Sequence, residues 1–247
     1  MTSLPHVGVQ LWAVRDTLAT DLPGTIARLA GLGFATIEPF DLLADPAGLA
    51  AAMKASGLRA ITAHARATGP DALALCEVAT SLGIATLIVP WTEPERFASR
   101  ESVRDVAAEL NDGATELAAH GLQLGYHNHW FELEAVFDGR TALEWLVDDL
   151  DPGVVLELDT YWAAAGGQDV PALLARLGDR VRFLHLKDGP LEPREPHVAL
   201  GDGVMPVRAI LDAATACELA VVELDSFDGD VFTALADSLA FLGGMAS

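Results

Sequence analysis

Three ionisable residues follow short apolar runs in this 247-residue chain, and their types could bind a metal ion or move protons. The segments LELDTYW, FLHLKD and VVELD place Asp159, His185 and Glu223 at comparable points. Alternate side chains of a strand share a face, so all three can point to the same side of a sheet. Two carboxylates and an imidazole around one point would suit Mn²⁺, Co²⁺, Zn²⁺ or Mg²⁺ better than a thiolate-binding metal.

The segment YHNHWFE adds His127 and His129, which share a face of another predicted strand. An imidazole titrates near neutral pH, so either histidine is a candidate general base or acid. Lys187 shares a face with His185 and is one of only two lysines in the chain. It could stabilise a developing oxyanion, or it could pair with Glu157 deeper in the fold.

Each of these residues also has a purely structural interpretation. Asp159 and Asp225 could cap the helices that follow them, and His185 alone could be a hydrogen-bonded core residue. As a group they are harder to explain in this way. Ionisable groups clustered inside a protein cost several kcal/mol, on the order of a domain's whole stability, unless partners or a metal offset them. The set therefore favours a functional site.

A repeated phrase indicates the elements that carry these residues: an apolar helical stretch, a glycine, then a short apolar run. The glycine suits the left-handed residue that ends a helix, and the run suits a buried parallel strand. Predicted strands cover residues 7–11, 35–38, 59–63, 86–89, 122–127, 154–158, 181–186 and 220–224. Predicted helices cover residues 20–31, 45–56, 70–82, 99–120, 140–149, 168–178, 204–217 and 229–242.

Strict alternation of strand and helix predicts an α/β fold with a parallel sheet. Eight such units in this length fit a single (β/α)8 TIM barrel domain over residues 1–247, with an open doubly wound sheet as the alternative. The first strand is not followed by a glycine-rich phosphate fingerprint, which disfavours a dinucleotide-binding fold. In a barrel the active site lies at the carboxyl ends of the strands, where the residues above are predicted to lie.

Composition excludes several classes of function. The net charge of −21 disfavours binding to nucleic acid or to anionic lipid. We find no apolar stretch of the roughly 20 residues that a membrane span needs and no signal peptide, and we therefore expect a cytoplasmic protein. Cys76 and Cys217 fall in predicted helices and are interpreted as small core residues.

The chain resembles the sugar phosphate isomerase/epimerase family of xylose isomerase-like barrels, among its YHNH-containing members. The resemblance covers nearly the whole chain and is carried by GVQLW, YHNHWFEL, ELDTYWAAAGG, HLKDG, LGDG and VVELD. It implies one divalent metal ion held by Asp159, His185 and Glu223. For the fourth ligand Glu132 is favoured, with His127 as its rival, because this chain has histidines where the sugar epimerases carry a glutamate.

The resemblance implies a sugar or cyclitol isomerase or epimerase that removes a proton next to a carbonyl and passes through an enediolate. His127, His129, Lys187 and Glu223 are the candidate catalytic residues. Candidate substrate-binding residues are Glu38, His64, Trp162 and His197. No glycine-rich phosphate cradle is found, which favours an unphosphorylated substrate.

Four alternatives stay open. An inosose dehydratase-like or 3-keto-sugar-processing lyase would use the same residues, and a Schiff-base lyase would use Lys187. A non-catalytic sugar-binding barrel should have lost metal ligands, and three are intact here. An AP endonuclease-like nuclease needs more metal ligands and a basic surface. The sequence does not reveal a subunit interface, so homo-oligomerisation also stays open.

Overall fold

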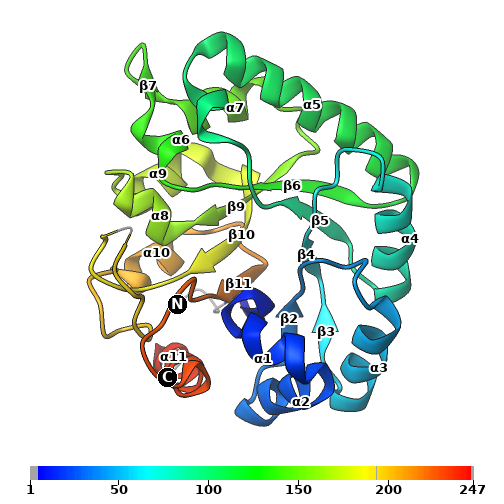
Figure 1. The fold of residues 1–247 in the computed structure, drawn as a ribbon. Coiled ribbons are helices and arrows are strands. Elements are labelled where there is room, and N and C mark those ends of the chain that lie inside the picture. The colour runs from blue at the N-terminus through cyan, green and yellow to red at the C-terminus, as the bar shows by residue number, and fades with distance from the viewer. Residues whose placement is uncertain (1–4, 193, 246–247) are drawn as a thin grey trace.

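The computed structural model describes residues 5–192 and 194–245. A nine-stranded parallel sheet curves into a barrel, and the helices lie around its outside (Figure 1). Along the sheet the strand order is β3-β2-β1-β11-β10-β9-β6-β5-β4. The barrel predicted from the alternating pattern is therefore confirmed, and all the carboxyl ends of these strands lie at one rim.

The strands lie close to their predicted positions. Those of the barrel are β1 (His6–Gln10), β2 (Thr36–Glu38), β3 (Arg59–Ala60), β4 (Thr62–His64), β5 (Thr86–Val89), β6 (Gln123–His127), β9 (Val155–Asp159), β10 (Val181–Leu186) and β11 (Leu219–Val222). A separate hairpin consists of β7 (Val136–Phe137) and β8 (Arg140–Thr141).

One predicted strand, at residues 59–63, is broken at Ile61 into β3 and β4. The first half pairs with β2 and the second half pairs with β5, so this segment joins the two ends of the sheet. Beyond the break, the His64 amide donates to the Pro39 carbonyl at 2.9 Å. The break therefore allows one segment to bend between two neighbours and bring His64 to the rim.

The helices are α1 (Arg15–Thr20), α2 (Leu22–Leu32), α3 (Pro46–Ser56), α4 (Ala72–Leu82), α5 (Arg100–Ala119), α6 (Phe131–Glu134), α7 (Ala142–Asp149), α8 (Thr160–Ala165), α9 (Val170–Leu177), α10 (Val207–Ala213) and α11 (Val231–Met245). Short 3-10 turns are η1 (Leu11–Val14), η2 (Pro94–Phe97) and η3 (Gly178–Arg180). The predicted helix 20–31 corresponds to α2, whereas α1 was not predicted, and the predicted helix 204–217 is shorter. The short α6 and α8 were not predicted; both follow strand ends and shape the site.

Local sequence explains the helix boundaries. Asp45 caps α3 by accepting the Gly48 amide at 2.9 Å, and Pro46 takes the first helical position. Gly57 ends the same helix at a φ of 71°, which a residue with a Cβ adopts at a cost. In the described part of the chain, no helix is long and apolar enough to cross a membrane.

Candidate functional site

Asp159, His185 and Glu223 meet at the carboxyl ends of β9, β10 and β11. His185 pairs in register with Asp159 on one side and with Val221 on the other, so Glu223 falls on the same face. One potential ligand atom from each residue lies within 4.8 Å of the others. All three side chains are buried. The structure therefore brings together the three residues that strand alternation predicted.

Asp159 shows that this trio suits a cation. Its Oδ1 atom accepts the Trp162 amide at 2.8 Å and so caps α8. Its Oδ2 atom is buried and accepts no hydrogen bond, although the Lys187 ammonium lies 2.9 Å away. Burial raises the pKa of Asp159 to about 6. A buried carboxylate oxygen whose nearest partner is already a cation is the kind of ligand that a hard divalent ion takes, so the donor set fits such an ion.

A second cluster of ionisable side chains, His64, His127, Glu157 and His185, lies beside the trio and shares His185 with it. Here Glu157 Oε2 is 2.7 Å from His64 Nε2, 3.1 Å from His185 Nε2 and 3.2 Å from His127 Nδ1. Burial opposes ionisation of Glu157, but the imidazoles of His185 and His64 outweigh it and hold the pKa of Glu157 well below its usual range. This group could also hold an ion, yet its ring nitrogens already converge on one carboxylate oxygen.

His185 bridges the carboxylates of three strands. Its Nδ1 atom lies 2.8 Å from Glu223 Oε2, and its Nε2 atom lies 2.7 Å from Glu38 Oε1. Burial disfavours the charged ring, but Glu157, Glu223 and Glu38 together raise the pKa of His185 well above its usual value. The raised pKa and the carboxylate at each ring nitrogen favour an imidazolium at His185, which neutralises part of the acidic charge.

Glu38, predicted to contact substrate, lies behind His185 instead. It is fully buried, accepts a hydrogen bond from Gln10 Nε2 at 2.7 Å, and accepts another from the Thr62 hydroxyl. Burial raises the pKa of Glu38, and the neighbouring Glu157 adds to this effect. The geometry makes Glu38 a positioning residue for His185. The sequence analysis missed Gln10, although a glutamine at the end of GVQ fits the strand-end rule.

Lys187 lies among carboxylates that differ from the one expected. Its Nζ atom is 2.9 Å from Asp159 Oδ2, 2.7 Å from Glu223 Oε2 and 2.7 Å from Asp225 Oδ2. Burial would lower its pKa, but these carboxylates raise the pKa of Lys187 well above the ordinary value. The alternative pairing with Glu157 is not what the structure shows, because imidazoles surround Glu157.

His127 and His129 are neutral at pH 7. Burial lowers the pKa of His127 to about 3, and the nearby His185 charge adds to this effect. Burial lowers the pKa of His129 to about 2, assisted by His127. The Nδ1 atom of His129 is buried and has no hydrogen-bond partner. Both rings can therefore accept a hydrogen bond or bind a cation through a nitrogen lone pair.

Sequence analysis favoured Glu132 over His127 as the strand-5 ligand, and the structure places these two side chains differently. Glu132 lies in α6, where its Oε1 accepts the Tyr126 hydroxyl at 2.8 Å and its Oε2 accepts the His129 amide at 2.9 Å. Glu132 belongs to neither of the groups that could hold an ion. His127 Nε2, in contrast, is 3.6 Å from Asp159 Oδ2. The short helix turns Glu132 away, which leaves His127 beside the trio.

A cavity of about 630 Å³ opens above these groups. Its polar floor and wall include His64, His127, His129, Lys187, Glu223 and Asp225. Its mouth includes two aromatic side chains, Trp12 and Trp91, which are 42% and 37% exposed. This volume falls within the range of sites for small ligands. The polar floor and the aromatic mouth suit a polar molecule with apolar faces, as sugars have.

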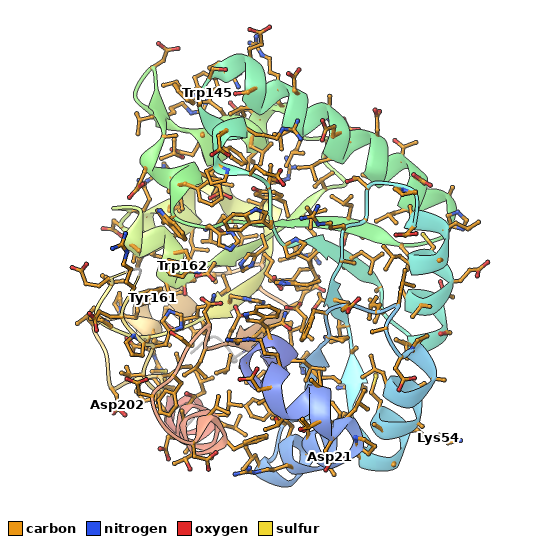
Figure 2. All side chains as sticks on the ribbon, viewed as in Figure 1. Asp21, Lys54, Trp145, Tyr161, Trp162 and Asp202 are labelled. Carbon is orange, nitrogen blue, oxygen red and sulfur yellow. The ribbon has the colours of Figure 1, made fainter. Side chains whose placement is uncertain are left out.

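Trp162 and His197 do not line this cavity. Trp162, which lies along α8 next to Tyr161 (Figure 2), is buried and packs on Trp130 at a ring distance of 5.0 Å. His197 is buried against Tyr161 at 4.6 Å, and its Nδ1 atom accepts the Asp225 amide at 3.1 Å. Both residues lie outside the lining of this cavity, and their predicted contact with substrate stays a prediction.

The protein is thus a nearly closed parallel barrel with clustered carboxylates and histidines at its carboxyl rim, where barrels of this kind carry their active sites. The family comparison agrees. The model of the family called xylose isomerase-like TIM barrel matches residues 26–242, and the chain belongs to that family.

Individual relatives are distant. An inosose dehydratase from Mesomycoplasma hyopneumoniae is 29% identical over 100 residues, which is 40% of this chain and 32% of that protein. The match thus spans about a third of the curated relative's length. A sugar phosphate isomerase/epimerase from Parabacteroides distasonis has a TM-score of 0.77 and 23% identity, covering 100% of this chain and 95% of the other.

A xylose isomerase-like TIM barrel protein from Mycobacterium smegmatis, solved in complex with magnesium, has a TM-score of 0.72 and 15% identity. The match covers 100% of this chain and 98% of that one. At these identities the solved structures establish the shared fold.

Proposed function

We propose that the chain is a divalent-metal-dependent enzyme that moves a proton next to a carbonyl group of a sugar or cyclitol, as an isomerase or epimerase. One observation carries this proposal: Asp159, His185 and Glu223 converge beside the cavity, and Asp159 keeps one buried carboxylate oxygen without a hydrogen bond. His127, beside Asp159, is the proposed fourth ligand. When bound, a divalent ion of this kind acts as a Lewis acid toward a carbonyl oxygen.

The side chains of the cavity have separate roles in this proposal. His129 lines the cavity and is the proposed acceptor of the proton from the carbon next to the carbonyl, a role that requires the negative charge developing on the substrate to raise its pKa. His64 lines the same cavity and donates a hydrogen bond to a substrate hydroxyl. Lys187 lines the cavity, and its ammonium group stabilises the oxyanion that develops as the proton leaves.

A dehydratase is the second candidate, and the partial similarity to an inosose dehydratase favours it. Both reactions begin with removal of the same proton. They differ in the next step, because a dehydratase expels a hydroxyl group as water whereas an epimerase or isomerase returns the proton to carbon. The two candidates can therefore be distinguished by their products.

The first test is solvent deuterium exchange. The enzyme, loaded with Mn²⁺ or Mg²⁺, is incubated in D₂O with ketoses and inososes, and NMR follows deuterium at carbon and any loss of water. Changes to residues that only support the metal ligands typically cost roughly 10–100-fold in activity. We expect the deuterium-exchange rate of Asp159→Asn to fall by more than this, because Asp159 is a proposed ligand. Metal content should fall in parallel. An asparagine retains the capping oxygen of α8, which makes this variant cleaner than one of His185, whose removal would leave several buried carboxylates unpaired.

Asp169→Asn is a matched control. Asp169 also caps a helix, α9, by accepting the Ala172 amide at 3.0 Å, but it is exposed. This variant should keep wild-type metal content and exchange. Full exchange and full metal content in Asp159→Asn would contradict the proposed site, and wild type without exchange on any keto-sugar or inosose would contradict the proposed reaction.

A further inference from the structure

The ammonium group of Lys187 lies where a metal ion would have to bind. Its side chain is almost completely buried, and two of its three carboxylate partners, Asp159 and Glu223, belong to the trio that could hold an ion. The closest approach to Asp159 uses Oδ2, the oxygen that accepts no hydrogen bond. Lys187 and a metal ion would therefore share the same carboxylates.

The two cations cannot both take these positions at low cost. A divalent ion binds carboxylate oxygen at roughly 2.0–2.2 Å. The Nζ atom of Lys187 lies 2.9 Å from Asp159 Oδ2, so an ion on that oxygen would be at most about 5 Å from the ammonium group. At such a distance, away from water, a double and a single positive charge repel strongly.

We propose that Lys187 is the resident cation of the ion-free site, and that a divalent ion displaces its ammonium group from Asp159 and Glu223 toward Asp225. This inference rests on the metal site of the proposed function. It also explains how the carboxylates stay buried without an ion. Lys187 and His185 supply the positive charges that compensate Asp159 and Glu223.

Asp225 provides the place to which the ammonium group moves. It already accepts a hydrogen bond from Lys187 at 2.7 Å, its side chain is 33% exposed, and it is not one of the trio. Both Lys187 and Asp225 line the cavity. A displaced ammonium group would thus keep one carboxylate partner and become accessible from the cavity, where it could meet the substrate.

The chain is suited to a direct test because Lys54 is its only other lysine. Lys54 is exposed on α3 and points outward at the edge of the molecule (Figure 2). Chelator-treated wild-type protein is acetylated briefly with acetic anhydride, with and without Mn²⁺, and both lysine peptides are quantified by mass spectrometry. We expect Mn²⁺ to accelerate acetylation of Lys187 at least tenfold and to leave Lys54 unchanged. In Asp159→Asn, Mn²⁺ should change neither rate.

Mn²⁺ affinity provides the second measurement. Titration calorimetry should show Lys187→Met binding Mn²⁺ at least tenfold more tightly than wild type, with Lys54→Met equal to wild type. The labelling experiment uses wild-type protein, so it stands even if Lys187→Met does not fold. Mn²⁺ binding that depends on Asp159, with no change in Lys187 acetylation, would overturn the displacement and leave the proposed function intact.

The opposite pattern separates the two proposals as well. Accelerated Lys187 acetylation without any deuterium exchange on sugars would support the displacement and overturn the proposed reaction. If neither wild type nor Lys187→Met binds Mn²⁺, the displacement and the metal-dependent function both fail.

Discussion

At the scale of single residues, the charged side chains of the site are matched by neighbours of opposite charge. His185 meets Glu38 and Glu223, and Lys187 meets Asp159, Glu223 and Asp225. The imidazoles of His127, His129 and His197 have low pKa values, because burial outweighs the effect of their acidic neighbours. Burial lowers the pKa of His197 to about 4, and the Lys187 charge adds to this effect. The site therefore keeps histidines with raised and with lowered pKa values side by side.

The low pKa of His197 predicts how this residue affects the stability of the folded protein in acid. The unfolded chain binds a proton at His197 near pH 6.5 and the folded protein only near pH 4, so its contribution is full above pH 6.5 and is lost as the pH falls toward 4. In His197→Asn the asparagine oxygen can still accept a hydrogen bond from the Asp225 amide, but the side chain no longer titrates. The loss of stability caused by protonation of His197 in the unfolded chain therefore disappears. We expect the stability gap between wild type and variant to shrink by on the order of 2 kcal/mol between pH 7 and pH 4.5.

Urea denaturation across that pH range measures the effect. His120→Asn is the control, because His120 is exposed at the end of α5 and its replacement should leave the wild-type profile unchanged. Parallel stability profiles for wild type and His197→Asn would show that His197 is not responsible.

At the scale of elements, one buried carboxylate organises the loop between β10 and α10. Asp188 accepts amide hydrogen bonds from Gly189 at 2.9 Å, Gly201 at 2.9 Å and Met205 at 3.0 Å. It also pairs with Val198 in an isolated antiparallel bridge. Since His197 precedes Val198 and contacts Asp225, the loop connects Asp188 to the partner of Lys187.

We therefore expect Asp188→Ala to lower the free energy of unfolding by on the order of 3 kcal/mol, because three amides, two of them on the buried residues Gly189 and Met205, lose their carboxylate acceptor. Hydrogen exchange should accelerate at Gly189, Gly201 and Met205, and urea denaturation should give the loss in stability. Asp202→Ala in the same loop is the control: Asp202 is exposed and lies at the edge of the molecule (Figure 2). Equal exchange rates in the two variants would refute the anchoring role.

At the scale of the whole molecule, the net charge of −21 acts against compactness. Salt screens such repulsion, since the screening length falls from roughly 30 Å at 0.01 M to about 8 Å at 0.15 M. We expect Tm to rise by roughly 2–4 °C over this range, corresponding to about 1 kcal/mol for a chain of this size. Differential scanning calorimetry in NaCl and in KCl should give the same rise. A fall in Tm, or a rise with only one of the salts, would exclude screening as the cause.

The sequence by itself determined the barrel and the rim at which the polar residues meet. Glycine-ended helices followed by apolar runs specify alternating helices and strands, and parallel strands bring their carboxyl ends to one rim. Alternation along β9 and β10 was enough to predict that Asp159 and His185 converge with Glu223, and the structure shows this convergence. Their role as metal ligands stays a prediction. These features are local, so a single chain reveals them.

Only the tertiary structure decided which side chain meets which. A short helix turns Glu132 toward Tyr126 and the His129 amide, leaving His127 near Asp159. Likewise Lys187 pairs with Asp225 rather than Glu157, and Glu38 lies behind His185. The physical reason is that alternation specifies the face of a strand, whereas the depth of a side chain in the barrel depends on the register between strands and on the turns that follow them. The register and the turns in their turn depend on contacts between residues far apart in the sequence.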